Sequence, residues 1–228
     1  MPSIERCRTA NATPGSSRGL LQPSLGGAAF DFVGQRAELP ADRAPNDVVA
    51  EHRQQIPGWF PVDHAQETFE ASYPFHPLVL SVFERKWQAL PRFQRTRGVL
   101  RLLALWVSRA YRENYTGAHQ DALIGLGSAP LDDPIFRAAV FEQLNEDLLD
   151  GAVTTDITGK KESHAIRLDE EAGSAIKKAR LHRKVATAIF FESNGGQGKT
   201  RAYATIPEIR LAVGGPEMDI GNVETALE

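Results

Sequence analysis

Apolar residues recur at helical spacing along most of the chain, and the most regular stretch spans residues 71–115. After Pro77, apolar residues follow one another at three- and four-residue intervals as far as Leu90, which predicts a helix. A second helix is predicted from about Phe93 to Tyr111, where a broad apolar face opposes a narrow row of arginines. These periods predict a mainly α fold.

The row of polar residues on the second helix supports two interpretations. At about 100° per residue, Arg101, Ser108 and Arg112 fall within about 60° of Arg97. The residues that point the other way and are expected to be buried are Leu102, Leu103, Trp106 and Ala110. One interpretation of the row is a solvated helix face. The other is a set of arginines aimed at phosphate, because the guanidinium fork matches the geometry of phosphate oxygens.

Start and stop signals predict further helices on both sides of this stretch. The expected helices run from Asp47 through His52, from Pro61 to Glu70, from Pro134 through Asp150 with Gly151 as the stop, from about Asp169 to Phe191, from the capping box Thr205–Glu208 to Val213, and from Asp219 to Glu228. Residues 122–126 are expected to form a short strand or a tight turn. Residues 1–45 are rich in Gly, Pro, Ser, Ala and Arg without sustained periodicity, which predicts a disordered segment or linker with one local apolar patch, Ala28–Val33.

Composition narrows the class of protein. The chain has 228 residues and a formal net charge of −3, so it is not a polycation built for nucleic acid. Cys7 is the only cysteine, which excludes an internal disulfide framework and fits a reducing, cytoplasmic compartment. No apolar run is long enough to span a bilayer, so no membrane partner is expected. The six histidines are dispersed without metal-ligand spacing, and no metal site is predicted.

Two strings carry a family resemblance. YPFHP at residues 73–77 is followed by LPRFQRTRGVLRLLA at residues 90–104. Together they resemble the bacterial family catalogued as domain of unknown function 499, which comprises large ATPases of the AAA+ type, often encoded in phage-defence islands beside DNA-modification genes. The resemblance extends to about residue 157 and again covers residues 184–228.

The resemblance implies a helical AAA+ lid over residues 46–128 and a helical, winged-helix-like domain over residues 129–228, expected to be truncated because it ends inside a helix pattern. AAA+ lids carry a sensor arginine that contacts the terminal phosphates of the nucleotide. It lies in segments of the form small-x-Arg-x-x-Leu-x-x-Leu, which makes Arg97 the first candidate here and Arg101 the second. ATP and magnesium are the implied cofactors of a complete family member, and neither is expected to bind tightly to this chain alone.

Ser193–Thr200, with the sequence SNGGQGKT, ends like a phosphate-binding loop. Such a loop needs glycine where Ser193 stands, and it needs a helix starting directly at its lysine. The residues after Thr200 lead to Pro207, so no helix is expected there and the motif is rejected.

A basic cluster, Lys177, Lys178, Arg180, Arg183 and Lys184, lies in the predicted helix over 169–191. A solvated face is one interpretation, and contact with a nucleic acid backbone or an acidic neighbouring domain is the other. Two further polar features have structural interpretations. His76 is expected to be packed and hydrogen-bonded, and Glu84–Arg85 is expected to be a surface pair.

The sequence therefore supports three functional hypotheses. The first is the C-terminal part of an AAA+ ATP-binding protein, whose lid supplies Arg97 or Arg101 to nucleotide held by the missing nucleotide-binding domain or another ATPase subunit, and which hydrolyses no ATP by itself. The second is a helical module that binds DNA through the basic cluster and the helix 206–213. The third is a free-standing NTPase built on residues 198–200.

Overall fold

The computed structural model describes residues 44–91, 93–115, 121–146, 148–159, 162–195, 203–215 and 220–228, all of which belong to one compact unit, Glu38–Glu228. The described part is mainly helical, which confirms the predicted fold class. An isolated parallel bridge joins Phe75 to Ile124, so the expected feature at 122–126 is a bridge followed by a tight turn. The N-terminal segment predicted to be disordered lies outside the described residues up to position 43.

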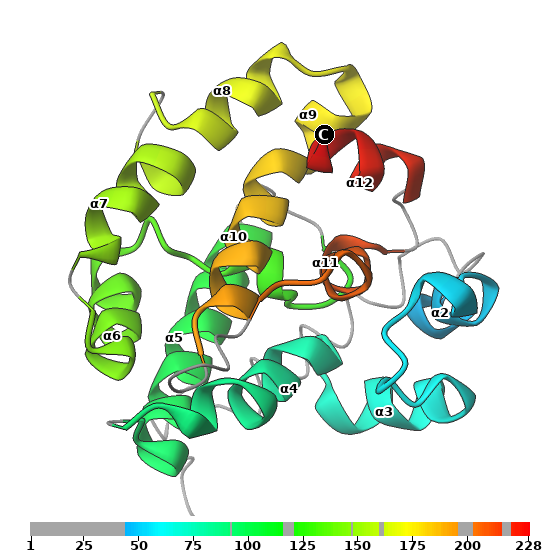
Figure 1. Cartoon of the computed structure of the whole chain (residues 1–228), viewed down its shortest axis with the longest axis horizontal. Coiled ribbons are helices and arrows are strands. Elements are labelled where there is room, and N and C mark those ends of the chain that lie inside the picture. The colour runs from blue at the N-terminus through cyan, green and yellow to red at the C-terminus, as the bar shows by residue number, and fades with distance from the viewer. Residues whose placement is uncertain are drawn as a thin grey trace, which may run out of the picture. The chain divides into compact units, whose positions relative to one another are not determined.

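Helical elements follow one another along the whole described part (Figure 1). In the first half they are α2 (Pro45–Glu51), η1 (Arg53–Gln55), η2 (Val62–His64), α3 (Ala65–Ser72), α4 (Pro77–Arg85), η3 (Trp87–Ala89), α5 (Arg95–Tyr115) and η4 (Leu126–Ser128). In the second half they are α6 (Pro134–Leu144), α7 (Leu149–Val153), the π-helical turn η5 (Thr154–Thr158), α8 (His164–Glu171), α9 (Ser174–Ala179), α10 (Leu181–Ser193), α11 (Ile206–Val213) and α12 (Ile220–Leu227). None of the described helices combines the length and apolar character needed to cross a membrane.

The core is built around stacked aromatic rings. The Phe191 ring of α10 lies between two tryptophans, 5.4 Å from Trp87 and 5.7 Å from Trp106, measured between ring centroids. Phe136 of α6 meets Trp106 edge-on at 5.4 Å. The Trp87 indole also donates a hydrogen bond to the Phe191 carbonyl oxygen at 3.2 Å. Burial of such large rings is the main stabilising contribution that the helices receive from one another.

Helix α10 is the element against which most of the second half of the fold packs. It packs against α8, α11, α12 and η4 (Figure 1). Its contact with η4 requires a glycine, because a Cβ at Gly127 would lie 2.8 Å from the carbonyl oxygen of Lys184. A separate run of contacts joins α5 to α6 and α2 through α3 to α4. The division into domains at residue 128 stays a prediction.

Three predicted helices are shorter than expected. The helix expected to reach Leu90 ends at Arg85 and is followed by the separate turn η3. The helix expected to continue through Asp150 ends at Leu144, because Asn145 adopts a left-handed conformation with φ 55°. Gly151, predicted to be the stop, lies inside α7. Asparagine tolerates the left-handed region better than most residues, and here it serves as the helix terminator that was assigned to glycine.

The helix expected over Asp169–Phe191 is three helices, α8, α9 and α10. Gly173 separates the first two, and Arg180, with φ 52°, separates the second and third. No sequence pattern predicts an arginine at positive φ. The apolar period also continues across Arg180, so nothing in the sequence indicated that the helix is interrupted there. By contrast, the predicted capping box at Thr205 and Glu208 and the helix to Val213 are confirmed.

Candidate functional site

Helix α5 presents the two arginines singled out as phosphate-contacting candidates. Its first turn is held against α6, because the Gln143 side-chain oxygen accepts a 2.9 Å hydrogen bond from the backbone nitrogen of Gln94. Gly98 is buried at the same point, where a Cβ would overlap the Gln143 side chain. The glycine in the sequence TRGVLR therefore lets the first turn of α5 approach α6, and this contact fixes the backbone on which Arg97 stands.

Arg97 is exposed and Arg101 is half-exposed, one turn further along α5. Arg101 forms an ion pair with Glu142 of α6, with 2.7 Å between Nη1 and Oε2. An exposed pair of this kind contributes about 0–1 kcal/mol, so it restrains Arg101 only weakly. Within the described part of the chain, no carboxylate pairs with Arg97. The two candidates thus lie on one exposed helix face, and Arg97 is the less committed of them.

The basic cluster does not lie on one helix. Lys177 and Lys178 are exposed on α9, and Arg180 is the exposed residue between α9 and α10. Arg183 and Lys184 are on α10, where carboxylates neutralise both of them. Arg183 pairs with Asp132 at 3.0 Å, and Lys184 pairs with Asp121 at 2.8 Å.

The glycine-rich segment at 193–200 follows a helix. Helix α10 continues to Ser193, whereas a phosphate-binding loop follows a strand. Only its first three residues, Ser193 to Gly195, belong to the described part of the chain, and Gly196–Thr200 do not.

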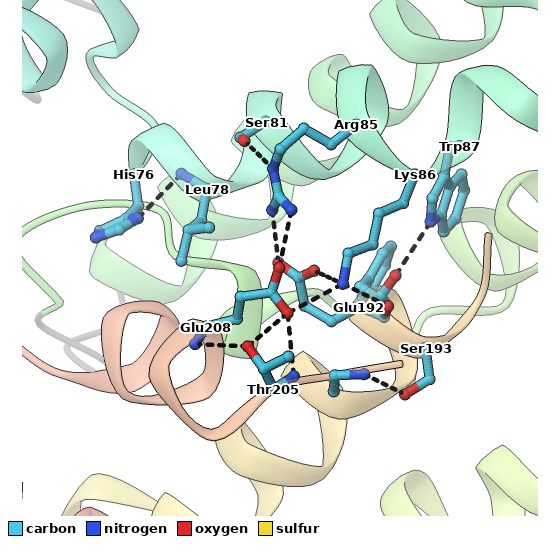
Figure 2. Close-up of polar contacts among 12 residues, drawn as sticks. His76, Leu78, Ser81, Arg85, Lys86, Trp87, Glu192, Ser193, Thr205 and Glu208 are labelled. Atoms are coloured by element: carbon cyan, nitrogen blue, oxygen red, sulfur yellow. Dashed lines mark hydrogen bonds and ion pairs between the residues drawn. The ribbon is translucent and has the colours of Figure 1, made fainter. Parts of the chain in front are cut away.

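Four charged side chains form a largely buried network that the sequence did not reveal (Figure 2). Arg85 donates to Glu208 at 2.8 Å and to Glu192 at 3.3 Å. The Lys86 ammonium lies 2.6 Å from a Glu192 carboxylate oxygen and 3.1 Å from one of Glu208. Two cations and two carboxylates thus alternate within one cluster, hereafter the Arg85–Glu208 network.

Three helix ends bring the Arg85–Glu208 network together. Arg85 and Lys86 stand at the end of α4, where the helix dipole favours cations. Glu192 lies in the last turn of α10 and is fully buried. Glu208 lies in the first turn of α11, where its carboxylate also accepts from the Thr205 backbone nitrogen at 3.0 Å. The dipole of its own helix therefore favours the charge of Arg85, Lys86 and Glu208, whereas Glu192 lies at a helix C-terminus, which disfavours a carboxylate.

The surroundings satisfy the remaining donors of the network. Lys86 donates to the backbone oxygens of Glu192 and Tyr203, at 3.0 and 3.1 Å. Arg85 donates from Nε to Ser81 at 2.7 Å and lies 3.7 Å from the centroid of the Trp59 ring. Because every charge has partners inside the fold, we interpret the network as a structural link between helix ends and not as a ligand-binding site.

The two carboxylates of the network differ in acidity. Burial raises the pKa of Glu192 above its ordinary value, against the opposing effect of the Lys86 ammonium. Burial acts on Glu208 in the same direction, but the hydrogen bonds from Thr205 and Lys86 outweigh it and lower the pKa of Glu208. The network therefore holds Glu208 as a carboxylate more strongly than Glu192.

The interpretation of Glu84–Arg85 as a surface pair is wrong, because Arg85 pairs across the fold with Glu192 and Glu208. One sequence signal could have indicated the network, although it was not used. Glu192 follows directly on the apolar run AIFF, and an acid at such a position requires a buried cation. Local periodicity does not indicate which cation pairs with it.

His76 is buried and hydrogen-bonded, as predicted. Its Nδ1 accepts from the Leu78 backbone nitrogen at 3.2 Å and caps α4, and the Phe69 ring meets the imidazole edge-on. Burial lowers the pKa of His76 from 6.5 to about 4. Among the described residues, no three or more His, Cys, Asp or Glu side chains are grouped in a way that would hold a metal ion.

No protein-family model matches the chain, and no curated protein or solved structure matches it.

Proposed function

We propose that this chain is the lid-bearing part of an AAA+ type ATPase assembly and presents Arg97 to the phosphates of a nucleotide bound by another domain or subunit. The observation that carries the proposal is the state of Arg97. It is exposed on a helical turn anchored by Gln143, and no carboxylate in the described part of the chain occupies its guanidinium. The resemblance of residues 90–104 to AAA+ ATPases of phage-defence islands supports the same role, in a cytoplasmic, DNA-related complex.

The physical argument concerns preorganisation. A guanidinium contributes most to phosphate binding when its backbone is already fixed and no internal carboxylate competes for it. Within the described residues Arg97 meets both conditions, whereas Arg101 must first leave Glu142. We therefore assign the phosphate contact to Arg97 and an auxiliary, charge-balancing role to Arg101.

The test begins by asking whether the neighbouring reading frame encodes a phosphate-loop ATPase, and such a protein is then purified with this chain. ATP hydrolysis by the complex is compared for the wild-type chain and Arg97→Ala. We expect the substitution to lower the rate by roughly 10²-fold or more, as removal of a phosphate-contacting arginine does. Arg101→Ala is expected to have a smaller effect, and Lys178→Ala, an exposed basic residue on α9, is the matched control. Equal rates for Arg97→Ala and Lys178→Ala would refute the role of Arg97.

The chain alone is expected to hydrolyse no ATP, with or without magnesium. A turnover that Lys199→Ala abolishes would instead support the free-standing NTPase, in which the glycine-rich segment holds the phosphates.

DNA binding is the alternative function, and the exposure of Lys177, Lys178 and Arg180 is the observation that favours it. The helix 206–213 provides no further support for DNA binding. Glu208 of this helix is buried in the Arg85–Glu208 network, and Arg210 pairs with Glu224 at 2.5 Å. Fluorescence anisotropy with duplex DNA decides between the two functions. A binding constant whose logarithm falls steeply as the logarithm of the salt concentration rises would favour the DNA-binding module. The same module predicts that the double variant Lys177→Ala with Lys178→Ala binds DNA more weakly.

A further inference from the structure

Helix α6 contacts the arginine-bearing part of α5 through two consecutive side chains. Gln143 is buried and accepts the 2.9 Å hydrogen bond from the Gln94 backbone nitrogen, which anchors the turn that carries Arg97. Glu142, the residue before it, is 52% exposed and binds the Arg101 guanidinium at 2.7 Å. One helix therefore anchors the first arginine and occupies the second.

Arg97 and Arg101 are close enough to bind one polyphosphate together. They are four residues apart on α5, which places their Cβ atoms about 6 Å from each other on the same side of the helix. Both side chains are exposed, and the long, forked guanidinium side chain suits contact with phosphate oxygens from either position. A polyphosphate bound to Arg97 therefore lies within reach of Arg101.

The Glu142 carboxylate opposes this second contact. It already accepts a hydrogen bond from Arg101, so a phosphate must displace it before Arg101 can bind the phosphate. It also repels a phosphate placed beside Arg101, because the two anions would be neighbours. An exposed ion pair changes an equilibrium by at most about fivefold, so Glu142 weakens phosphate binding without preventing it.

We infer that Glu142 competes with phosphate for Arg101 and thereby sets the phosphate affinity of the arginine pair on α5. The inference rests on the proposed function, in which Arg97 contacts the phosphates, and adds a regulator to that site. It also fixes the sign of a measurable effect. Removal of the Glu142 charge tightens phosphate binding, whereas loss of an ion pair that merely holds α5 in place would weaken it.

The first measurement uses the chain alone and inorganic tripolyphosphate as the probe. The NMR signal of the Arg97 side-chain Nε–H group reports the dissociation constant at this site. Glu142→Gln keeps the shape of the side chain and removes its charge, and we expect it to lower the dissociation constant about two- to fivefold. In an Arg101→Ala background the same substitution is expected to have no effect, because the contested guanidinium is gone.

Glu224→Gln is the matched control for the change in net charge. Glu224 is 49% exposed and pairs with Arg210, away from α5, so its replacement is expected to leave the dissociation constant unchanged. Equal dissociation constants for Glu142→Gln and Glu224→Gln would overturn the inference. An effect of Glu142→Gln that persists in the Arg101→Ala background would also overturn it, and so would an Arg97 signal that tripolyphosphate leaves unmoved.

ATP hydrolysis by the complex with the phosphate-loop ATPase provides the second measurement. We expect Glu142→Gln to lower KM for ATP about two- to fivefold and to leave kcat unchanged, because Arg101 would bind the phosphates equally before and during the reaction. If Arg97→Ala slows hydrolysis but Glu142→Gln leaves KM unchanged, the role of Glu142 is refuted and the proposed function stands. If Arg97→Ala has no effect, both are refuted.

Discussion

Buried titratable side chains are expected to make the stability of this protein depend on pH. His76 is the clearest case, because its neutral imidazole both caps α4 through Nδ1 and packs against the Phe69 ring. Protonation would place a charge in a buried site and convert the capping acceptor into a donor. Glu192 and Glu208 show the same principle with carboxylates, whose pKa values shift in opposite directions because only Glu208 has enough donors to offset its burial.

The first prediction concerns His76. Its pKa falls from 6.5 in the unfolded chain to about 4 in the folded chain, so between these values the unfolded chain binds a proton that the folded chain does not. The stabilisation is therefore complete above pH 6.5 and is lost as the pH falls toward 4, by about 3 kcal/mol. Urea unfolding at pH 7, 6, 5 and 4 measures this slope.

His76→Asn is the control for that measurement, since asparagine keeps a capping oxygen and does not titrate. The variant is expected to be less stable at pH 7 but to lose less stability on acidification. An unchanged slope would assign the pH dependence to other groups, with Glu208 the first to consider.

At the scale of the element, glycines and positive-φ residues decide where helices end and how closely they pack. Asn145 and Arg180 end helices that the apolar period would have continued. Gly127 matters for a different reason, because η4 approaches the backbone of α10 at Lys184. Gly151 is its opposite, an exposed glycine in a helix with open space around it.

The second prediction compares these two glycines. Gly127→Ala is expected to destabilise the fold by roughly 1–3 kcal/mol, because its Cβ would meet a backbone oxygen that cannot move independently of α10. Gly151→Ala is expected to stabilise by about 0.5–1 kcal/mol, because alanine favours helix and nothing obstructs its Cβ. Thermal unfolding of both variants provides the measurement. A stabilising Gly127→Ala would show that η4 and α10 are not held in this close contact.

At the scale of the molecule, the Arg85–Glu208 network joins segments that are far apart in the chain. Its pairs are separated by 106 to 123 residues and link the end of α4 to the end of α10 and the start of α11. The stacked rings of Trp87 and Phe191 connect the same parts of the chain. An alternating set of buried charges fixes the relative positions of these helix ends more specifically than apolar contact alone, because each mismatch leaves a charge unpaired.

The third prediction removes one cation from the network. Lys86→Met leaves the fully buried Glu192 with Arg85 as its remaining partner in the network and is expected to cost about 3–5 kcal/mol at pH 7. Glu192 already has a raised pKa, and loss of the lysine raises it further. Stability tied to a raised carboxyl pKa is present at low pH and lost as the pH rises. The cost of Lys86→Met should therefore shrink as the pH falls from 7 toward 5.

The double variant Lys86→Met with Glu192→Gln is the matched control, because it removes both charges of the pair. Chemical denaturation of the four proteins of this cycle measures the coupling. We expect the double variant to recover at least about 1 kcal/mol relative to Lys86→Met. Additive effects would mean that the two side chains do not interact in solution.

Periodicity and capping chemistry were sufficient to predict the helices but not to predict which helices and side chains contact one another. The capping box at Thr205 and Glu208 was predictable because both residues act within one turn. The arginines of α5 were predictable as a group sharing one side of the helix. The difference between Arg97 and Arg101 was not predictable, because it depends on other helices. Glu142 of α6 pairs with Arg101, and no described carboxylate pairs with Arg97. The exposure of Leu100, Val107 and Tyr111 on α5 was not predictable, because a period identifies apolar residues without showing how many of them the fold can cover.

The sequence by itself determined that the chain is mainly α, where most helices begin, and that His76 is a packed residue, because each of these follows from interactions within a few residues. The tertiary structure alone decided that Arg85 and Lys86 meet Glu192 and Glu208, and that one side of α5 stays exposed. The physical reason is the range of the forces involved. Helix propensity and capping act over one or two turns. Burial and charge pairing depend on which helix, distant in the sequence, packs against the residue in the folded chain.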